Sequence, residues 1–118
     1  MAETKLSLIV VIINGGYSDE LMEIVKNEGA RGGTIINAIG SVRKDAEKLY
    51  GITINPDKEL ILLIVDKTIR NKMLKAIYTK AGKDSPMESI AFSMPVEKAT
   101  SNLLSQYTKK DEQKPDES

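Results

Sequence analysis

Apolar residues occur in short runs along the chain, and glycine, proline and charged residues separate these runs. The first run, Lys5 to Ile13, is rich in Val and Ile and has no helical period, which predicts a strand buried on much of both faces. Asn14-Gly15-Gly16 ends this strand, and Ser18 is then expected to cap a helix with acidic residues in its first turn. Gly29 is expected to stop that helix.

A second strand is predicted between Gly32 and Gly40, with Ile35, Asn37 and Ile39 on one face. The pattern then weakens over residues 41–58. A helical turn near Arg43 to Leu49, a short strand at 52–54 and a turn at 55–57 fit this segment. Such a long excursion is unusual in a small domain and indicates a functional loop.

Glu59 to Val65 predicts a third, buried strand. A helix should follow, capped by Asp66 or Thr68 and terminated by Gly82. The last strand is predicted from Ser89 to Met94, where Pro95 ends it. Met22, Met73 and Met94 are expected in the core.

The end of the sequence is expected to contribute little to the core. Beyond Val96, a weak apolar pattern through Ala99, Leu103 and Leu104 suggests a final helix. Lys109 to Ser118 contains no apolar residue and should be disordered. We therefore assign residues 1–108 to one domain and 109–118 to a polar tail.

The predicted order is strand, helix, strand, strand, helix, strand, which is the ferredoxin-like α+β plan with a four-stranded antiparallel sheet. Two helices can cover only one face of that sheet. The other face needs another cover, and copies of the same chain would provide it most simply.

Charge and composition exclude several classes of protein. The 118 residues contain 17 Lys plus Arg and 17 Asp plus Glu, and a balanced charge disfavours nucleic acid as a partner. No Cys is present, so disulfides and cysteine zinc sites are excluded. The longest apolar run is too short to cross a bilayer, and no signal-peptide pattern is evident, so we expect a cytoplasmic protein without membrane insertion.

Catalytic chemistry has few candidate groups. The sequence contains no His, which removes the commonest general base and histidine metal ligands. Asp45, Glu47, Asp57 and Glu59 lie in or beside the excursion, but nothing fixes a catalytic pair, and a solvated charged loop is the simpler interpretation. The glycines between Gly29 and Gly40 fit either caps and turns or a phosphate-binding backbone.

Three segments nevertheless resemble a known family. They are Gly-Ala-Arg-Gly-Gly-Thr at 29–34 with Gly40 after the strand, Glu-Leu-Ile-Leu-Leu-Ile-Val-Asp at 59–66, and Ile-Ala-Phe-Ser-Met-Pro-Val at 90–96. Together they resemble the P-II nitrogen-regulator superfamily, in particular its divergent P-II-like signalling branch. The similarity covers roughly residues 5–99.

The resemblance implies a function in signal transduction and not in catalysis. It implies a homotrimer whose sheets face inward and whose loop, here residues 41–58, regulates a transporter, an enzyme or a transcription factor. It also implies a small effector, usually an adenine nucleotide such as ATP, ADP or AMP, and a role in nitrogen metabolism. No cofactor or metal is expected.

The resemblance assigns effector residues and partner-binding residues. The effector set is Gly32, Thr34, Gly40, Ser41, Arg43, Lys83 and Ser89, and the partner-binding set is Arg43, Lys44, Tyr50 and Ile52. The sequence departs from the family pattern in several places, among them Val42 and the segment 83–89, which replaces the family's glycine-rich loop. Val42 replaces a usual glycine, and Glu88 lies in the loop before the last strand, where its carboxylate would repel a triphosphate.

Two alternatives stay open on the sequence alone. One is a small enzyme with the same ferredoxin-like plan that uses loop carboxylates. The other is a structural or metal-tolerance trimer of similar architecture that binds no nucleotide. Fold alone does not separate these functions.

Overall fold

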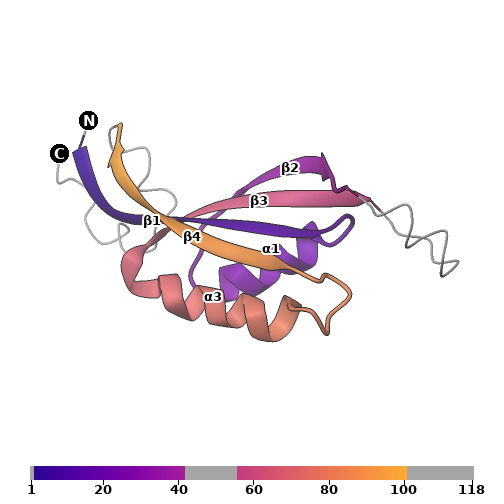
Figure 1. The fold of residues 1–118 in the computed structure, drawn as a ribbon. Coiled ribbons are helices and arrows are strands. Elements are labelled where there is room, and N and C mark those ends of the chain that lie inside the picture. Colours follow the sequence, from indigo (N-terminus) through magenta and orange to yellow (C-terminus); the bar gives the residue numbers. More distant parts are fainter. Residues whose placement is uncertain (1, 42–55, 101–118) are drawn as a thin grey trace, which may run out of the picture.

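A computed structural model of the chain describes residues 2–41 and 56–100. Its elements are β1 (Ala2–Asn14), α1 (Ser18–Asn27), β2 (Thr34–Ile39), β3 (Asp57–Asp66), α3 (Lys67–Ala81) and β4 (Ile90–Ala99). This order, drawn in Figure 1, confirms the predicted succession of strands and helices. The elements predicted within 42–55, the end of the predicted final helix and the polar tail lie outside the described residues.

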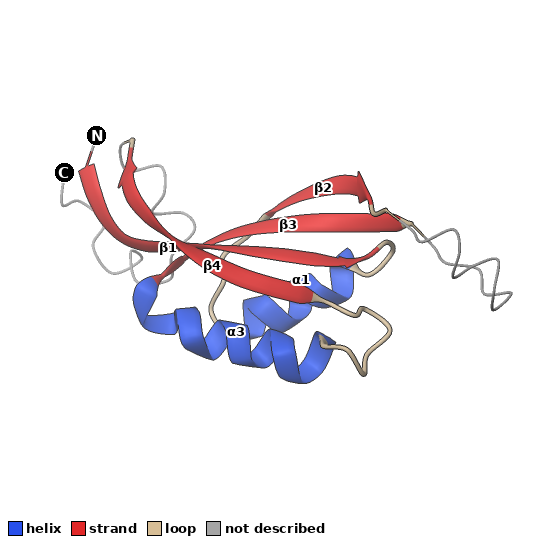
Figure 2. Ribbon diagram, viewed as in Figure 1, coloured by secondary structure: helices blue, strands red, loops and turns tan. Residues whose placement is uncertain are grey.

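The four strands form one sheet in the order β2-β3-β1-β4, and every neighbouring pair is antiparallel. β1 lies inside the sheet because it is rich in Val and Ile, which suit a strand with neighbours on both sides. Both helices cover the same face of the sheet, as Figure 2 shows. The ferredoxin-like α+β prediction is therefore confirmed.

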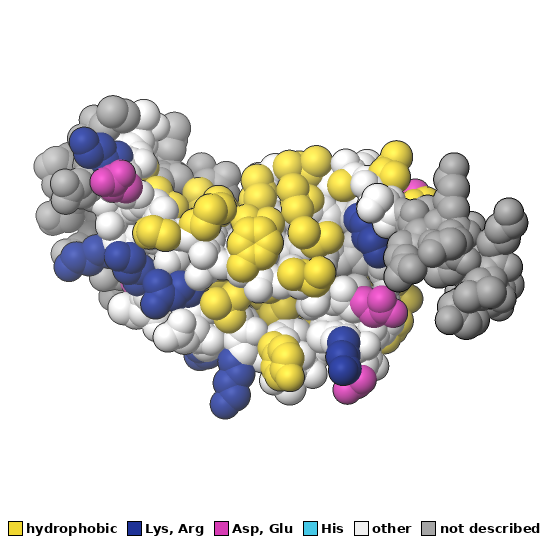
Figure 3. Space-filling model, in the orientation of Figure 1, with side chains coloured by type: hydrophobic (Ala, Val, Ile, Leu, Met, Phe, Trp, Pro, Cys, Tyr) yellow, Lys and Arg dark blue, Asp and Glu magenta, His cyan; other side chains and the backbone are white. Residues whose placement is uncertain are grey.

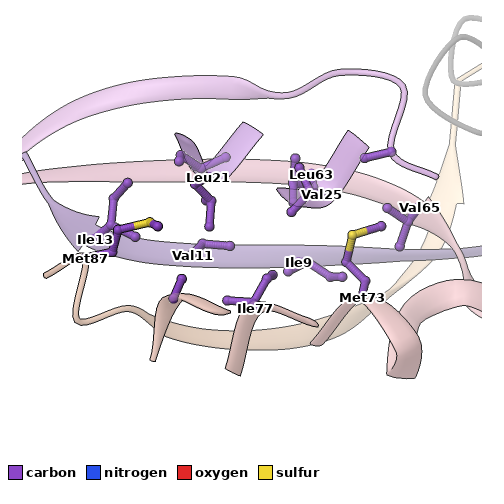
Figure 4. Close-up of a cluster of buried hydrophobic side chains, with 13 residues drawn as sticks. Ile9, Val11, Ile13, Leu21, Val25, Leu63, Val65, Met73, Ile77 and Met87 are labelled. Carbon is purple, nitrogen blue, oxygen red and sulfur yellow. The ribbon is translucent and has the colours of Figure 1, made fainter. Parts of the chain in front are cut away.

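The hydrophobic core lies between the sheet and the two helices. Alternate residues of β1 point toward the helices and are fully or almost fully buried: Ile9, Val11 and Ile13. Side chains of β3, α1, α3 and the loops complete the cluster in Figure 4, namely Ile61, Leu63, Val65, Leu21, Val25, Ala30, Met73, Ile77, Ala81 and Met87. Met73 is a core residue as predicted, and Met22 packs against the cluster while partly exposed.

The ends of α1 differ in part from the prediction. Ser18 is the first helical residue, and the N-cap is Tyr17, which makes no side-chain cap hydrogen bond. The C-terminus follows the glycine signal, because Gly29 has φ +117° and the N–H of Ala30 donates to the Val25 carbonyl. This is a Schellman-type ending, in which glycine adopts the left-handed conformation without a Cβ clash.

Both ends of α3 agree with the sequence signals. The Asp66 carboxylate accepts hydrogen bonds from the N–H and the hydroxyl of Thr68, both at 2.9 Å. Gly82 follows the last helical residue, and a Cβ at this position would lie 2.4 Å from the Tyr78 carbonyl oxygen. The helix therefore ends at a close backbone approach that requires glycine.

The last strand is longer than predicted. β4 continues through Pro95 to Ala99, so the predictions that Pro95 ends the strand and that a helix follows Val96 are wrong for the described residues. Proline is tolerated here because β4 is an edge strand, where one row of N–H groups has no ladder partner. Met94 lies on the face away from the helices and is 44% exposed, so its assignment to the core was also wrong.

That face of the sheet, which we call the open face, is apolar in nearly every position. The register aligns its residues in three rows across the strands: Thr34, Leu62, Val10 and Phe92; Ile36, Leu60, Ile12 and Ile90; and Ile64, Leu8 and Met94. Figure 3 shows hydrophobic side chains gathered over the strands. Of the two helices in the described ranges, neither combines the length and apolar character needed to span a membrane.

Candidate functional site

Three connections of the chain meet at one end of the sheet, which we call the loop end. The N–H of Asn14 donates to the Met87 carbonyl at 3.0 Å, and the N–H of Gly15 donates to the Asp57 carbonyl at 2.9 Å. These bonds join the β1–α1 turn to the α3–β4 loop on one side and to the start of β3 on the other. The loop end is therefore one connected unit.

The same end holds the two ends of the segment between β2 and β3. The N–H of Gly40 donates to the Pro56 carbonyl at 2.7 Å. We call this hydrogen bond the clamp. It fixes the points at which residues 41–55 leave and rejoin the sheet.

Two side chains extend this connection across the rim of the open face. Lys58 Nζ donates to Asn14 Oδ1 at 2.6 Å, and Asn14 Nδ2 donates to the Pro86 carbonyl at 2.9 Å. Asn14 and Lys58 are direct partners in the register of β1 and β3. A lysine next to the clamp is thus linked, through one amide side chain, to the α3–β4 loop.

A hollow of 630 Å³ opens at the loop end beside β2, lined by Gly15, Gly16, Asn37, Ala38, Ile39, Asp57, Lys58 and Glu59. Glu59 Oε1 accepts a hydrogen bond from the N–H of Gly16 at 3.2 Å, which ties the turn before α1 to β3. The lining combines one cation, two carboxylates and an amide. It suits a small polar ligand better than an apolar one.

The α3–β4 loop has a defined structure without a glycine-rich run. Ser85 organises it, because its carbonyl accepts from the N–H of Glu88 at 3.1 Å and its hydroxyl accepts from the N–H of Met87 at 3.0 Å. Glu88 has φ +45°, a conformation that non-glycine residues rarely adopt. Its exposed carboxylate lies next to Ser89, whose N–H donates to the Ala81 carbonyl at 2.8 Å.

The predicted effector residues that the structure describes lie in three separate places. Gly40 and Ser41 are at the loop end of β2, whereas Gly32 and Thr34 are at the opposite end, about 20 Å away along the strand. Lys83 and Ser89 are at the loop end but beside β4, about 14 Å across the sheet. A single chain therefore does not gather them into one pocket. Arg43, Lys44, Tyr50 and Ile52 lie outside the described residues.

Three polar residues of the loop end were not predicted as site residues. Asn14 was interpreted as a turn residue, Lys58 as the end of the excursion, and Glu59 as part of a solvated charged loop. Their contacts depend on the register of β1 with β3, which joins residues more than forty positions apart. Polar residues at the ends of two adjacent buried strands were the only available signal.

Among side chains, the potential metal ligands of this sequence are mainly carboxylates. The sequence has no His and no Cys, and in the described ranges no group of three or more Asp or Glu side chains is placed to hold an ion.

Comparison with known proteins places this geometry among known folds. No protein-family model matches the chain, and no curated protein matches it by sequence. Solved structures do match. A candidate PII-like signaling protein from Thermus thermophilus aligns over 91% of this chain and 99% of its own, with a TM-score of 0.68 and 20% identity. The chain has the PII-like fold.

Two further structures support this assignment of the fold. CPII from Thiomonas intermedia, bound to ADP, AMP and acetate, aligns over 92% of this chain and 99% of its own, with a TM-score of 0.65 and 12% identity. Arabidopsis thaliana PII bound to citrate aligns over 80% of this chain and 78% of its own chain, with a TM-score of 0.58 and 16% identity. The resemblance drawn from the sequence is thus confirmed for the PII-like fold.

Proposed function

We propose that this chain is a PII-like regulatory protein, without catalytic activity of its own, that assembles as a homotrimer and binds a small effector. The effector is an adenine nucleotide, and residues 41–58 present its signal to a partner protein. CPII, which has the same fold, is bound to ADP and AMP in its solved structures. That likeness supports the class of effector.

The observation that carries the proposal is the open face. It exposes large apolar side chains, including Ile90 at 62%, Phe92 at 44% and Ile36 at 42%. A contiguous apolar surface of this kind marks an interface, and closed symmetry lets identical chains cover it without leaving an open end. Three sheets packed through this face would leave the helices of each chain on the outside.

Assembly also explains why the effector residues are divided. Gly40 and Ser41 flank the β2 edge of the sheet, and Lys83 and Ser89 flank the β4 edge. When the β2 edge of one chain meets the β4 edge of the next, these two groups form one cleft, and a nucleotide that extends along β2 from Gly40 would reach Thr34 at the other end of that strand. The effector would then bind between chains and only in the assembled protein.

The clamp supports regulation through residues 41–58. An effector that contacts Gly40 or Ser41 acts at the point where this segment leaves the sheet. It can shift the segment only by its difference in affinity between two states of that segment. The partner would be a transporter, an enzyme or a transcription factor, in the cytoplasm and in nitrogen metabolism.

The test is calorimetric titration with ATP, ADP, AMP and cyclic nucleotides, with the mass in solution measured on the same sample. We expect a trimer with one saturable site per chain. Thr34→Val should weaken nucleotide binding about tenfold, the loss of roughly one hydrogen bond. Thr79→Val, on the exposed side of α3, is the matched control and should bind normally.

The outcomes separate the parts of the proposal. A monomer at micromolar concentration would contradict the assembly and, with it, the shared cleft. A trimer that binds none of the nucleotides would contradict the effector and favour the structural trimer, because the Glu88 carboxylate at the cleft repels phosphate.

A further inference from the structure

Positive charge is concentrated in one helix of this electrically balanced chain. Between residues 67 and 83 the sequence has no Asp or Glu, and its cations are Lys67, Arg70, Lys72, Lys75, Lys80 and Lys83. Most of α3 is solvent-facing apart from the side that packs on the core through Met73, Ile77 and Ala81. Elsewhere the chain carries a net negative charge, so this concentration is a property of α3 and not of the whole surface.

Four residues on the exposed side of α3 form what we call the basic strip: Lys67, Lys72, Lys75 and Tyr78. Tyr78 is 79% exposed, which is high for an aromatic ring. Figure 3 shows cationic side chains projecting along the margin of the molecule where Figure 1 places α3. Tyrosine is enriched among the residues that contribute most of the binding energy in protein–protein interfaces.

An assembly that buries only the open face leaves the strip accessible. The helices lie on one face of the sheet and the open face is the other. In the described ranges, Lys72 forms an ion pair with Glu28 Oε1 at 3.9 Å, with 60% of the lysine side chain exposed. Such exposed pairs contribute little, so Lys72 remains available to another anion.

The neighbouring helix limits the shape of the partner. α1 exposes Asp19, Glu20 and Glu23, and its C-terminal end contacts α3 through Glu28. Packed helices lie about 8–10 Å apart, so a bilayer or a nucleic-acid duplex resting on α3 would also meet these carboxylates. A single polypeptide segment is narrow enough to contact the cations alone.

We propose that the basic strip is a docking site for an acidic polypeptide segment of a partner protein. The segment lies along α3, which is about 22 Å long, places carboxylates against Lys67, Lys72 and Lys75, and covers the ring of Tyr78. This contact is separate from the nucleotide cleft and from residues 41–58. Its charge gives it a strong dependence on ionic strength.

The experiment uses the full chain and a fluorescein-labelled Glu/Ala peptide of about 16 residues, which matches the length of α3 as a helix. Its Gln/Ala analogue is the control peptide. The triple variant Lys67→Gln, Lys72→Gln, Lys75→Gln is compared with Lys5→Gln, Lys26→Gln, Lys98→Gln, which removes the same charge from exposed sites elsewhere. Fluorescence anisotropy is measured at low and at physiological salt.

We expect the wild type to bind the Glu/Ala peptide and not its Gln analogue. The α3 triple variant should bind at least tenfold more weakly, the control triple less than twofold, and Tyr78→Ala severalfold more weakly. Equal losses in both triple variants would overturn the proposal, because they would reflect net charge alone. So would tighter α3-dependent binding to phosphatidylserine vesicles or to a DNA duplex.

A second copy of the chain is the remaining occupant, since α1 is acidic. Self-association that is abolished both by the α3 triple variant and by Glu20→Gln with Glu23→Gln would overturn the proposal in favour of that contact. Failure of nucleotide binding does not affect this test, because the peptide assay needs no effector.

Discussion

Ser7 faces the helices from β1, and its hydroxyl is buried at 0% exposure without a hydrogen-bond partner among the described residues. It is flanked in the register by Val65 and Pro95, neither of which has a side chain that hydrogen-bonds. A buried hydroxyl without a partner retains the full cost of its lost hydration.

Ser7→Ala should therefore raise the free energy of unfolding by about 1 kcal/mol, because it removes a polar atom that makes no bond. Urea denaturation measures this difference. Ser93→Ala is the control. Ser93 lies on β4, on the same face of the sheet as Ser7, but is partly exposed, so this change should alter stability by less than about 0.5 kcal/mol. A decrease for Ser7→Ala would mean that the hydroxyl has a partner.

A second local destabilisation lies at Glu88, whose backbone adopts a left-handed conformation with φ +45°. Glu88→Gly should stabilise the protein by about 1 kcal/mol, because glycine adopts this conformation without a Cβ clash. Asp84→Gly, in the same loop but outside the left-handed region, should not stabilise it. Thermal unfolding of both variants tests this, and equal shifts would contradict the backbone explanation.

At the scale of elements, the C-terminus of α3 depends on one close approach. Gly82→Ala should lower the free energy of unfolding by about 2–3 kcal/mol, because the added Cβ would lie 2.4 Å from the Tyr78 carbonyl oxygen and the backbone must move. A Cβ on Gly32 meets nothing within 4 Å. Gly32→Ala should therefore cost less than about 0.5 kcal/mol in the same urea titration, and a comparable loss would contradict this account.

Most elements could be predicted from the sequence because each has a local signal. The run from Lys5 to Ile13, Asp66 before α3 and Gly29 after α1 all act within a few residues. The errors arose where distant residues decide. Pro95 lies within β4 only because that strand is at the edge of the sheet, and Met94 is exposed because its side of the sheet has no helix.

The candidate site was less predictable for the same reason. The bond from Lys58 to Asn14 requires the register of two strands that are distant in sequence. The effector residues that the resemblance predicts lie near the ends of strands. Within one chain, however, they lie at opposite edges of the sheet. Nothing in a single sequence states how a second chain would bring such edges together.

At the scale of the whole molecule, we expect the same kind of substitution to change the oligomeric state on one face and not on the other. Phe92→Asp places a charge in the middle row of the open face and should convert the proposed trimer to a folded monomer. Tyr78→Asp, at an aromatic residue on the helix side that is more exposed than Phe92 (79% against 44%), should leave the trimer intact. Sedimentation velocity distinguishes the two masses, and a wild type that already sediments as a monomer would contradict the prediction.

The clamp between Gly40 and Pro56 has a consequence for evolution. The sheet already holds the ends of this connection together. The entropic cost of closing the loop therefore rises only slowly with its length, by about 0.6 kcal/mol for each doubling. The sequence in between can therefore be lengthened, shortened or exchanged with little effect on the folding of the remaining chain. Recognition of new partners can diversify there by insertion and recombination, while selection for stability acts on a separate set of residues.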